Sequence, residues 1–293
     1  MPVLALALAL WQCAVPSRGA ALQRAPSFPA SVEMVKVTTL VSGGHGRPLT
    51  GLRREDFQVW ADGRRQEIAY FGAPTDAQAF DVALAVDTSG SMAAAHEQVA
   101  LAAVRFLYEV PSARLRLLAS FDNDVRFWRT GAPTAEVVKQ MNEAAAPRGA
   151  TALRSAVHAV LRRFAGADRA ALVVLTDGEE QGSIVGPGEL RAAIQSSNVT
   201  IYPVRYATAG PLGGSWFARQ TLAAMARESG GRVFEGHGRD AAGVFQQISA
   251  ELGAQYVLGF VPLDRSPGVH PLQVKVRAGH VHHRAGYLIG GDR

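Results

Sequence analysis

Small oxygen-bearing side chains follow an apolar run in the first third of the chain. The run from Val82 to Val86 is followed by Asp87, Ser89 and Ser91 in the sequence VALAVDTSGSM. A run that is apolar at every position is typical of a strand buried in a parallel sheet. Ligands of doubly wound sheets bind at the carboxyl ends of such strands. A carboxylate followed by two hydroxyls at alternate positions therefore indicates an oxygen-donor site at that edge.

Two later loops carry the same kind of donor. Thr151 lies in RGATAL, just before a helical pattern, and Asp177 lies in LTDGEE, at the end of a second apolar strand. Together the three loops offer two carboxylates and three hydroxyls, without histidine or cysteine. Hard oxygen donors suit Mg²⁺, and Mn²⁺ or Ca²⁺ less selectively. The predicted metal ligands are Asp87, Ser89, Ser91, Thr151 and Asp177.

Each loop also has an ordinary interpretation. Ser91 or Thr151 can serve as a helix N-cap, because a hydroxyl at that position accepts a backbone N–H bond. Asp177 with Gly178 is a common turn pair. The metal interpretation rests on convergence, since all three loops stand where one doubly wound fold would bring them together.

Strands and amphipathic helices alternate between residues 79 and 252, which predicts a doubly wound, mostly parallel six-stranded sheet with helices on both faces. The expected strands cover 82–86, 114–121, 125–130, 170–176, 199–206 and a short segment near 233–235. The expected helices cover 93–108, 152–164, 189–196, a segment beginning at 222, and 240–252.

The two flanks read as β-structure. Residues 22–78 contain a hairpin signal, Ala61 to Arg64 (ADGR), between alternating strands, and residues 253–293 return to strand patterns. Each flank is too short to enclose a core alone. We therefore expect both to build one small β subdomain, into which residues 79–252 are inserted.

With these loops and elements in place, the chain resembles von Willebrand factor A-type domains and their metal-ion-dependent adhesion site. The motif D-x-S-x-S stands at Asp87, Ser89 and Ser91, and its Thr and Asp partners stand at Thr151 and Asp177, without substitution. The flanks are similar to a bacterial exported family of von Willebrand A-related proteins.

This resemblance implies binding rather than catalysis. It implies that Ser89, Ser91 and Thr151 touch the metal directly, while Asp87 and Asp177 act mostly through water. The metal would then stay electrophilic and take an Asp or Glu carboxylate from a partner protein. The expected function is thus a metal-dependent protein-binding module that is not an enzyme.

Other functions are disfavoured because the residues that they require are missing, or they differ from the expected function only in cellular compartment. A phosphatase of the haloacid dehalogenase kind needs a second aspartate two residues after the first, where this chain has Ser89. No G-x-S-x-G elbow and no nucleotide-binding glycine loop follows a strand. An intracellular accessory subunit of an AAA+ ATPase would keep the same metal site, and only the N-terminal segment would distinguish it.

Composition and charge limit the classes of partner that the chain is expected to bind. Among 293 residues, 30 basic and 25 acidic side chains give a net charge of +5, without a basic run interleaved with aromatics, so we expect no nucleic acid. No small-molecule substrate is indicated either.

The N-terminus reads as an export signal. Residues 1–21 form an apolar segment with small residues before a cut after Ala21, although no Lys or Arg precedes the apolar run. An uncleaved anchor, or lipidation at Cys13, is the alternative, and either would be the chain's membrane attachment. Cys13 is the single cysteine, so no disulfide is expected. The predicted location is periplasmic, cell-surface or secreted.

Four further groups have predicted roles. Asp122 and Asp124 are interpreted as turn formers, and Glu179 and Glu180 as an acidic rim beside Asp177. The histidines of HVHH are interpreted as a solvated strand face rather than a metal site. The aromatic pair after GPLGG is interpreted as a helix start with a buried apolar face, with an exposed partner contact as the alternative. These last two groups are His280, His282, His283, Trp216 and Phe217.

Overall fold

The computed structural model describes residues 34–74, 79–92, 96–144, 150–206, 215–236 and 241–290. The predicted signal segment, residues 1–21 with Cys13, lies outside these ranges. No helix within them is both long and apolar enough to cross a membrane.

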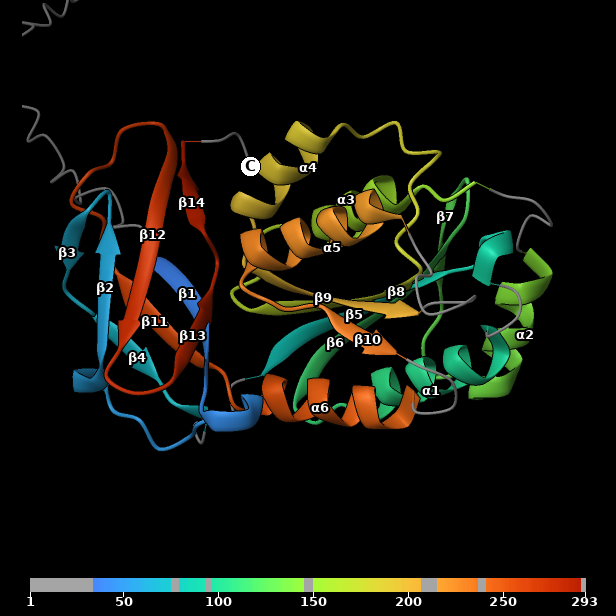
Figure 1. The fold of residues 1–293 in the computed structure, drawn as a ribbon, viewed down its shortest axis with the longest axis horizontal. Coiled ribbons are helices and arrows are strands. Elements are labelled where there is room, and N and C mark those ends of the chain that lie inside the picture. The colour runs from blue at the N-terminus through green and yellow to red at the C-terminus, as the bar shows by residue number, and fades with distance from the viewer. Residues whose placement is uncertain are drawn as a thin grey trace, which may run out of the picture. The chain divides into compact units, whose positions relative to one another are not determined.

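A six-stranded sheet forms the centre of the α/β part (Figure 1). Its strands stand in the order β10-β9-β8-β5-β6-β7, and each neighbouring pair is parallel except β6 and β7, which are antiparallel. The predicted mostly parallel sheet is therefore confirmed. The strands are β5 (Phe80–Asp87), β6 (Ala113–Phe121), β7 (Val125–Trp128), β8 (Ala170–Thr176), β9 (Val199–Tyr206) and β10 (Phe234–Gly236).

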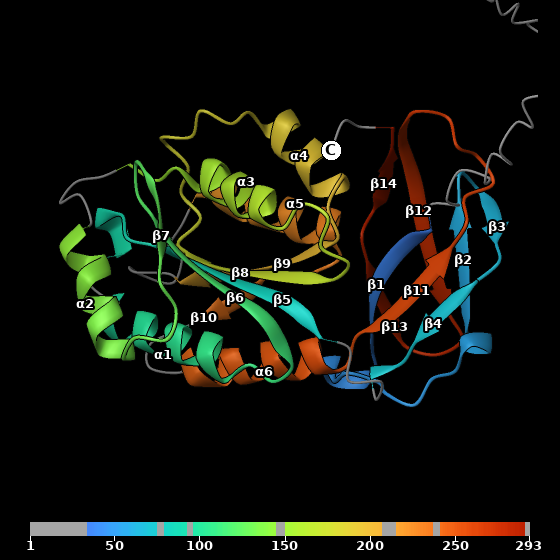
Figure 2. The ribbon, with the colours of Figure 1, turned by 180° about the vertical axis from the view of Figure 1, so that it is seen from behind.

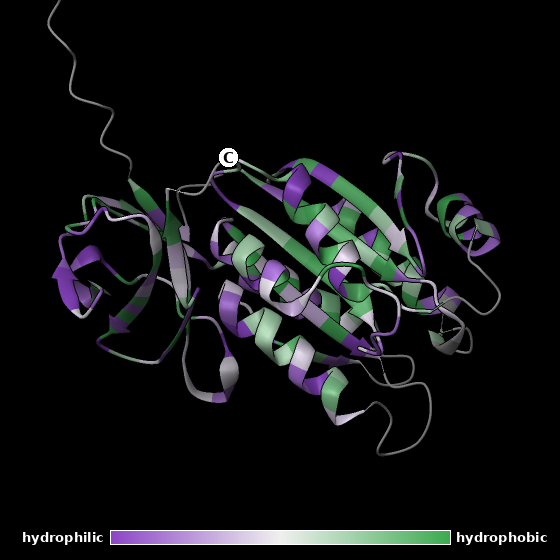
Figure 3. Ribbon diagram, turned by 90° about the horizontal axis from the view of Figure 1, so that it is seen from above, coloured by the Kyte–Doolittle hydropathy of each residue, from purple (hydrophilic) through white to green (hydrophobic). Residues whose placement is uncertain are grey.

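Helices cover both faces of this sheet, as Figures 1 and 2 show from opposite sides. Strand β5 divides its side chains between the faces, because successive residues of a strand point to opposite sides. Val82, Leu84 and Val86 pack with α1, α2 and α6, whereas Ala83 and Ala85 pack with α3, α4 and α5. Apolar residues accordingly run along the central strands (Figure 3). The helices are α1 (His96–Glu109), α2 (Thr134–Ala144), α3 (Leu153–Arg163), α4 (Pro187–Gln195), α5 (Trp216–Ser229) and α6 (Ala241–Gly253).

Helix α2 is absent from the sequence-based predictions. It buries only Val137, Val138 and Met141, and its other positions are mostly polar. An apolar stripe of three residues is too narrow to give a clear helical period in the sequence.

The two flanks pair with one another in two four-stranded sheets, ordered β13-β1-β11-β4 and β14-β12-β2-β3. Strand β1 lies between β11 and β13, and β12 lies between β2 and β14, so N- and C-terminal strands share both sheets. The predicted fold class, with a β part built from both flanks, is confirmed; the boundaries at 78 and 252 remain predictions. The strands are β1 (Val35–Ser42), β2 (Phe57–Ala61), β3 (Arg64–Gln66), β4 (Tyr70–Gly72), β11 (Tyr256–Phe260), β12 (Gly268–Val276), β13 (His280–His283) and β14 (Gly286–Ile289).

The hairpin predicted from ADGR joins β2 to β3. Its two central residues, Asp62 and Gly63, both have positive φ, at 52° and 71°. Positive φ at both positions is the type I′ geometry that matches the twist of paired strands.

A buried arginine connects the C-terminal flank to the α/β part. The Arg284 guanidinium donates to the carbonyl oxygens of Ser197 and Lys36, each at 3.0 Å, and to the Asn198 Oδ1 at 3.1 Å. Burial lowers its pKa to about 10, which leaves it charged at neutral pH. Beside it, the Ala285 N–H donates to the Glu228 carbonyl at the end of α5.

This junction requires a glycine after α5. Gly230 caps the helix at φ 85°, and a Cβ there would lie 2.6 Å from the backbone nitrogen of Arg284. We expect Gly230→Ala to destabilise the protein by about 2–4 kcal/mol, through backbone strain and displacement of β13. Urea unfolding measures this loss.

Gly253→Ala is the matched control. Gly253 ends α6, and no atom lies within 4 Å of a Cβ at this position. The same substitution there should leave stability unchanged or raise it by about 0.5 kcal/mol, because alanine favours helix. Equal effects of the two substitutions would contradict the close approach at Gly230.

Candidate metal centre

Asp87 stands at the carboxyl end of β5, between β6 and β8, and is fully buried. Its two carboxylate oxygens accept bonds from different loops. The Ser89 backbone N–H donates to Oδ1 at 2.9 Å, and the Thr176 hydroxyl donates to Oδ2 at 2.6 Å. The carboxylate is therefore held in place by the loop that follows it and by the end of the neighbouring strand.

Burial makes this carboxylate hard to ionise. It raises the pKa of Asp87 to about 6, against the bonds from Ser89 and Thr176, which lower it. The nearby charge of Asp177 raises it slightly further. A positive ion at this edge would offset both costs.

Asp177 directly follows β8, which pairs with β5 in parallel register. Its residue is 6% exposed, and its Oδ1 accepts the Glu179 N–H at 3.0 Å. No bond to its Oδ2 forms within the part of the chain that the structure describes. One oxygen thus positions the loop while the other stays available.

Thr151 lies two residues before the start of α3 and is 3% exposed. Its carbonyl accepts the N–H groups of Gln181 and Gly182, at 3.0 and 3.1 Å, which ties it to the loop after β8. The next residue, Ala152, donates to the Asp122 carbonyl at the end of β6. The Thr151 hydroxyl makes no hydrogen bond among the described residues, so this buried donor–acceptor group is available to a ligand.

The structure brings Asp87, Ser89, Thr151 and Asp177 to one edge of the sheet. Ser89 is buried. Ser91 belongs to the short 3₁₀ turn Gly90–Met92, and its side chain is not among those that the structure describes. The donors are oxygens from a buried carboxylate, a second carboxylate and small hydroxyls. This set fits a hard divalent cation such as Mg²⁺.

One contributor was missing from the predicted set. Thr176 donates to Asp87, and its hydroxyl also accepts the Gly178 N–H at 3.0 Å. A hydroxyl residue at the last position of an otherwise apolar strand is the sequence signal for such a role.

The two glutamates of the predicted acidic rim bind groups of the neighbouring loops. Glu180 accepts bonds from the Arg154 N–H in α3 and from Ser183, at 2.8–3.0 Å. Glu179 accepts the Ser215 N–H at the start of α5, at 2.9 Å. Both carboxylates thus hold neighbouring loops against the end of β8.

Two other groups differ in part from their predictions. Asp122 forms the predicted turn by accepting the Asp124 N–H at 2.9 Å, but it is fully buried and also binds Arg126. Of the HVHH histidines, His283 is not solvated. It accepts the Val274 N–H and donates to its neighbour's carbonyl, so it joins β12 to β13.

The aromatic pair corrects another prediction. Ser215 caps α5 by accepting the Ala218 N–H, so the predicted helix start is confirmed. The predicted burial of the two rings is wrong, because Trp216 is 61% exposed and Phe217 is 74% exposed. The helix buries residues further along, including Leu222 and Met225, instead.

A second cluster of metal-ligand residue types lies in the β part. Asp62, Asp264 and His270 bring ligand atoms within 4.8 Å of one another. However, both ring nitrogens of His270 face oxygens: Nδ1 lies 2.8 Å from Asp62 Oδ2 and Nε2 lies 2.9 Å from the Ser266 carbonyl. An imidazole between two acceptors donates from both nitrogens, which is the protonated form. The cluster is therefore an ion pair rather than a metal site.

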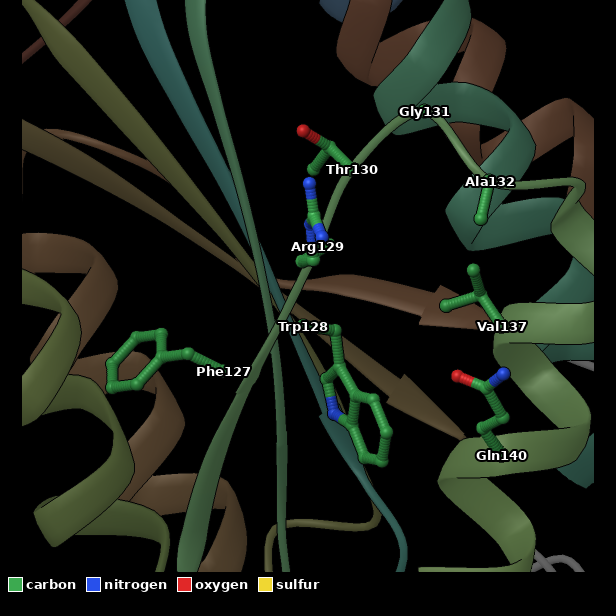
Figure 4. Close-up of a pocket in the computed structure, with 8 residues that line it drawn as sticks. All are labelled: Phe127, Trp128, Arg129, Thr130, Gly131, Ala132, Val137 and Gln140. Carbon is green, nitrogen blue, oxygen red and sulfur yellow. The ribbon is translucent and has the colours of Figure 1, made fainter.

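A pocket of about 580 Å³ lies beside the edge strand β7 and α2 (Figure 4). Trp128 and Phe127 leave β7 on opposite sides, and Trp128 lies toward Val137 and Gln140. Arg129 is the one charged residue among those that line it, and none of the predicted metal ligands does so. The pocket is thus separate from the candidate metal centre.

No protein-family model and no curated protein matches this sequence. Solved structures are similar to it at low identity. A von Willebrand factor type A protein from Catenulispora acidiphila is 13% identical, over 88% of this chain and 71% of that one, with a TM-score of 0.46. The conserved hypothetical protein BatB from Bacteroides thetaiotaomicron is 17% identical, over 60% of this chain and all of that one, with a TM-score of 0.43.

The vWF domain of the type V pili tip protein Mfa5 from Porphyromonas gingivalis is 14% identical, over 59% of this chain and 95% of that one, with a TM-score of 0.43. Two of these three structures carry the von Willebrand name in their own descriptions.

The raised pKa of Asp87 predicts that the stability of the protein in the presence of a chelator depends on pH. Ionising the buried carboxylate destabilises the fold. The cost is absent below the ordinary pKa of 3.8 and complete above about 6. Asp87→Asn should therefore be more stable than the wild type at pH 7.5, by at most about 3 kcal/mol. The advantage should vanish near pH 4.

Urea unfolding in EDTA at both pH values measures this difference. Asp124→Asn is the control, because the Asp124 side chain is 78% exposed in the neighbouring turn. Parallel pH profiles for the wild type and Asp87→Asn would contradict the buried, costly carboxylate.

The His270 ion pair predicts a second loss of stability with rising pH, in a higher pH range than that of Asp87. The Ser266 carbonyl and the Asp62 carboxylate raise the pKa of His270 above 6.5, against burial, which lowers it. Its stabilising contribution is complete below 6.5 and is lost as pH rises through the raised pKa. Asp62→Asn keeps a residue that tolerates φ 52° but removes the charge, so the pKa of His270 should fall.

Titration of the His270 ring protons by NMR from pH 5 to 9 measures this pKa. Glu67→Gln, an exposed change beside the same hairpin, should leave the titration unchanged. An unshifted pKa in Asp62→Asn would show that the carboxylate does not hold the imidazolium.

Proposed function

We propose that this protein is a metal-ion-dependent protein-binding module that captures an acidic side chain of a partner. The observation that carries the proposal is the buried carboxylate of Asp87, joined at one sheet edge by the available oxygens of Thr151 and Asp177. This arrangement collects oxygen donors and shields them from water. Mg²⁺ is the proposed ion, with Mn²⁺ or Ca²⁺ as less selective occupants.

The chain's own residues divide the task. Thr151, Ser89 and Ser91 would hold the ion through hydroxyls, while Asp87 and Asp177 supply charge close to it. A bound cation would supply a positive centre that accepts one more carboxylate. Thr176 fixes the orientation of Asp87, and Glu180 fixes the start of α3 next to Thr151. These bonds hold the donors in place before a ligand arrives.

We propose binding rather than turnover because no described residue stands as a general acid two positions after Asp87, as a phosphatase would require. Ser89, where a phosphatase would place its general acid, is buried, and its backbone N–H donates to Asp87. Glu179 and Glu180 are engaged with backbone N–H groups of the neighbouring loops. We propose export as the setting, with a partner protein that presents Asp or Glu.

Thr151→Val tests the metal centre. The substitution preserves shape but removes the hydroxyl that has no internal partner, so Mn²⁺ affinity should fall about ten-fold or more. Electron paramagnetic resonance of free Mn²⁺ measures that affinity directly. Thr200→Val is the matched control, since Thr200 is also 3% exposed but lies within β9, and it should bind Mn²⁺ as the wild type does.

Capture from an envelope extract then tests the partner. Proteins retained in Mg²⁺ should be lost both in EDTA and with Asp87→Ala. If Mn²⁺ binds normally to Thr151→Val, the site is wrong. If a partner binds equally in EDTA, the metal-bridged mechanism is wrong.

A further inference from the structure

Highly exposed apolar side chains stand on the segments that adjoin the candidate metal centre. Among the described residues, the three most exposed large apolar side chains are Ile184 at 95%, Phe217 at 74% and Trp216 at 61%. All three lie on segments that follow the carboxyl ends of β8 and β9. Exposed apolar groups that cluster in this way mark contact surfaces more often than isolated ones do.

The aromatic pair is fixed next to the metal edge by two contacts. Glu179, two residues after Asp177, accepts the Ser215 N–H at 2.9 Å, and Trp216 follows at once. A Cβ on Gly178 would lie 3.1 Å from the Ala218 side chain and 2.9 Å from Leu222, so α5 packs directly on the residue after Asp177. The rings therefore stand one turn of helix from the loop that carries a predicted ligand.

Ile184 flanks the opposite side of the same loop. Its N–H donates to the Ser155 hydroxyl in the first turn of α3, at 3.2 Å, and α3 begins two residues after Thr151. The loop from Asp177 to Val185 thus runs between Thr151 and the aromatic pair, with Ile184 at one end. Exposed apolar residues therefore stand at both ends of the segment that joins Asp177 to its neighbours, with the aromatic pair beside Glu179 and Ile184 beside Ser155.

Neither ring of the aromatic pair is needed to start or bury α5 within the described residues. Ser215 already caps α5, and the buried face of the helix begins at Ala218. Trp216 and Phe217 contact each other edge to face, with ring centroids 5.2 Å apart, so the two rings adjoin. Rigid exposed aromatics lose little conformational entropy on binding and are enriched among the residues that dominate interfaces.

The geometry points to a partner segment in which the metal-binding Asp or Glu is flanked by apolar side chains, with Trp216 and Phe217 as the surface that reads them. This inference rests on the proposed function, because the acidic side chain is taken to bind the metal. The carboxylate would give the segment its register, and the aromatic pair would select among acidic sequences. Trp216 and Phe217 are thus specificity residues of the interface.

Selection from a displayed heptapeptide library with Asp or Glu fixed at the centre tests the inference. In Mg²⁺, the wild-type protein should enrich Leu, Ile, Phe or Trp at positions near the fixed acid. The Trp216→Ala/Phe217→Ala variant should lose that enrichment while still binding Mn²⁺ normally. Leu263→Ala, which removes a 59% exposed apolar side chain in the β11–β12 loop, is the matched control and should select as the wild type does.

A synthetic peptide of the enriched sequence then gives affinities. The double variant should bind it about thirty-fold more weakly, as the loss of an interface hot spot implies. Peptides that bind only in Mg²⁺ but show no apolar preference beside the fixed acid would overturn the inference and leave the proposed function standing. Peptides that bind equally in EDTA and to Asp87→Ala would overturn the proposed function, and this inference with it. No enrichment above Asp87→Ala would overturn both.

Discussion

The site depends on one buried carboxylate. Asp87 is fully buried at the centre of the sheet, where ionisation is costly enough to raise its pKa to about 6. The Ser89 N–H and the Thr176 hydroxyl offset only part of that cost. A fold selected for stability alone would place an apolar residue here, since β5 is otherwise apolar from Val82 to Val86. A cation at this edge, as we propose, would offset the cost of the ionised carboxylate.

The sheet order explains why this carboxylate meets its partners. Strand β5 stands between β6 and β8. The chain that follows β5 builds β6 and β7 on one side of it and then crosses to build β8 on the other side. Loops that are distant in sequence, before α3 and after β8, therefore meet at one edge. Backbone bonds to the Thr151 and Asp122 carbonyls then fasten these loops together. The topology provides the proximity, and these bonds provide the geometry.

The sequence predicts the parts of the fold with strong local signals. The apolar run of β8, the hairpin at Asp62 and Gly63, and the glycine stop of α5 all stand where predicted. Helix α2 was missed because its buried stripe holds three residues. The five ligands could be predicted because their spacing is local within each loop, and they remain a prediction. The hydroxyl of Thr176 at the end of β8 is visible in the sequence, but its partner is not, since Asp87 lies 89 residues away.

Exposure is the property that sequence patterns predict least well. The spacing after GPLGG correctly indicated a helix, but whether its first residues were buried depended on what packs against them. Gly178 brings Ala218 and Leu222 of α5 against the β8 loop, which turns the preceding Trp216 outward.

The acidic residues around the proposed site bear on how reactive a bound cation would be. Glu179 and Glu180 lie close to Asp177 in sequence, and both accept backbone N–H groups of the adjoining loops. Glu180 also pairs with the Arg154 guanidinium at 3.7 Å. The remaining direct donors are mostly hydroxyls, which carry no charge. A cation held mainly by hydroxyls keeps more of its charge for a further carboxylate than one surrounded by four acids would. In the site that we propose, the rim carboxylates therefore hold the loops and are not direct ligands, which would leave a bound cation able to take a carboxylate from a partner.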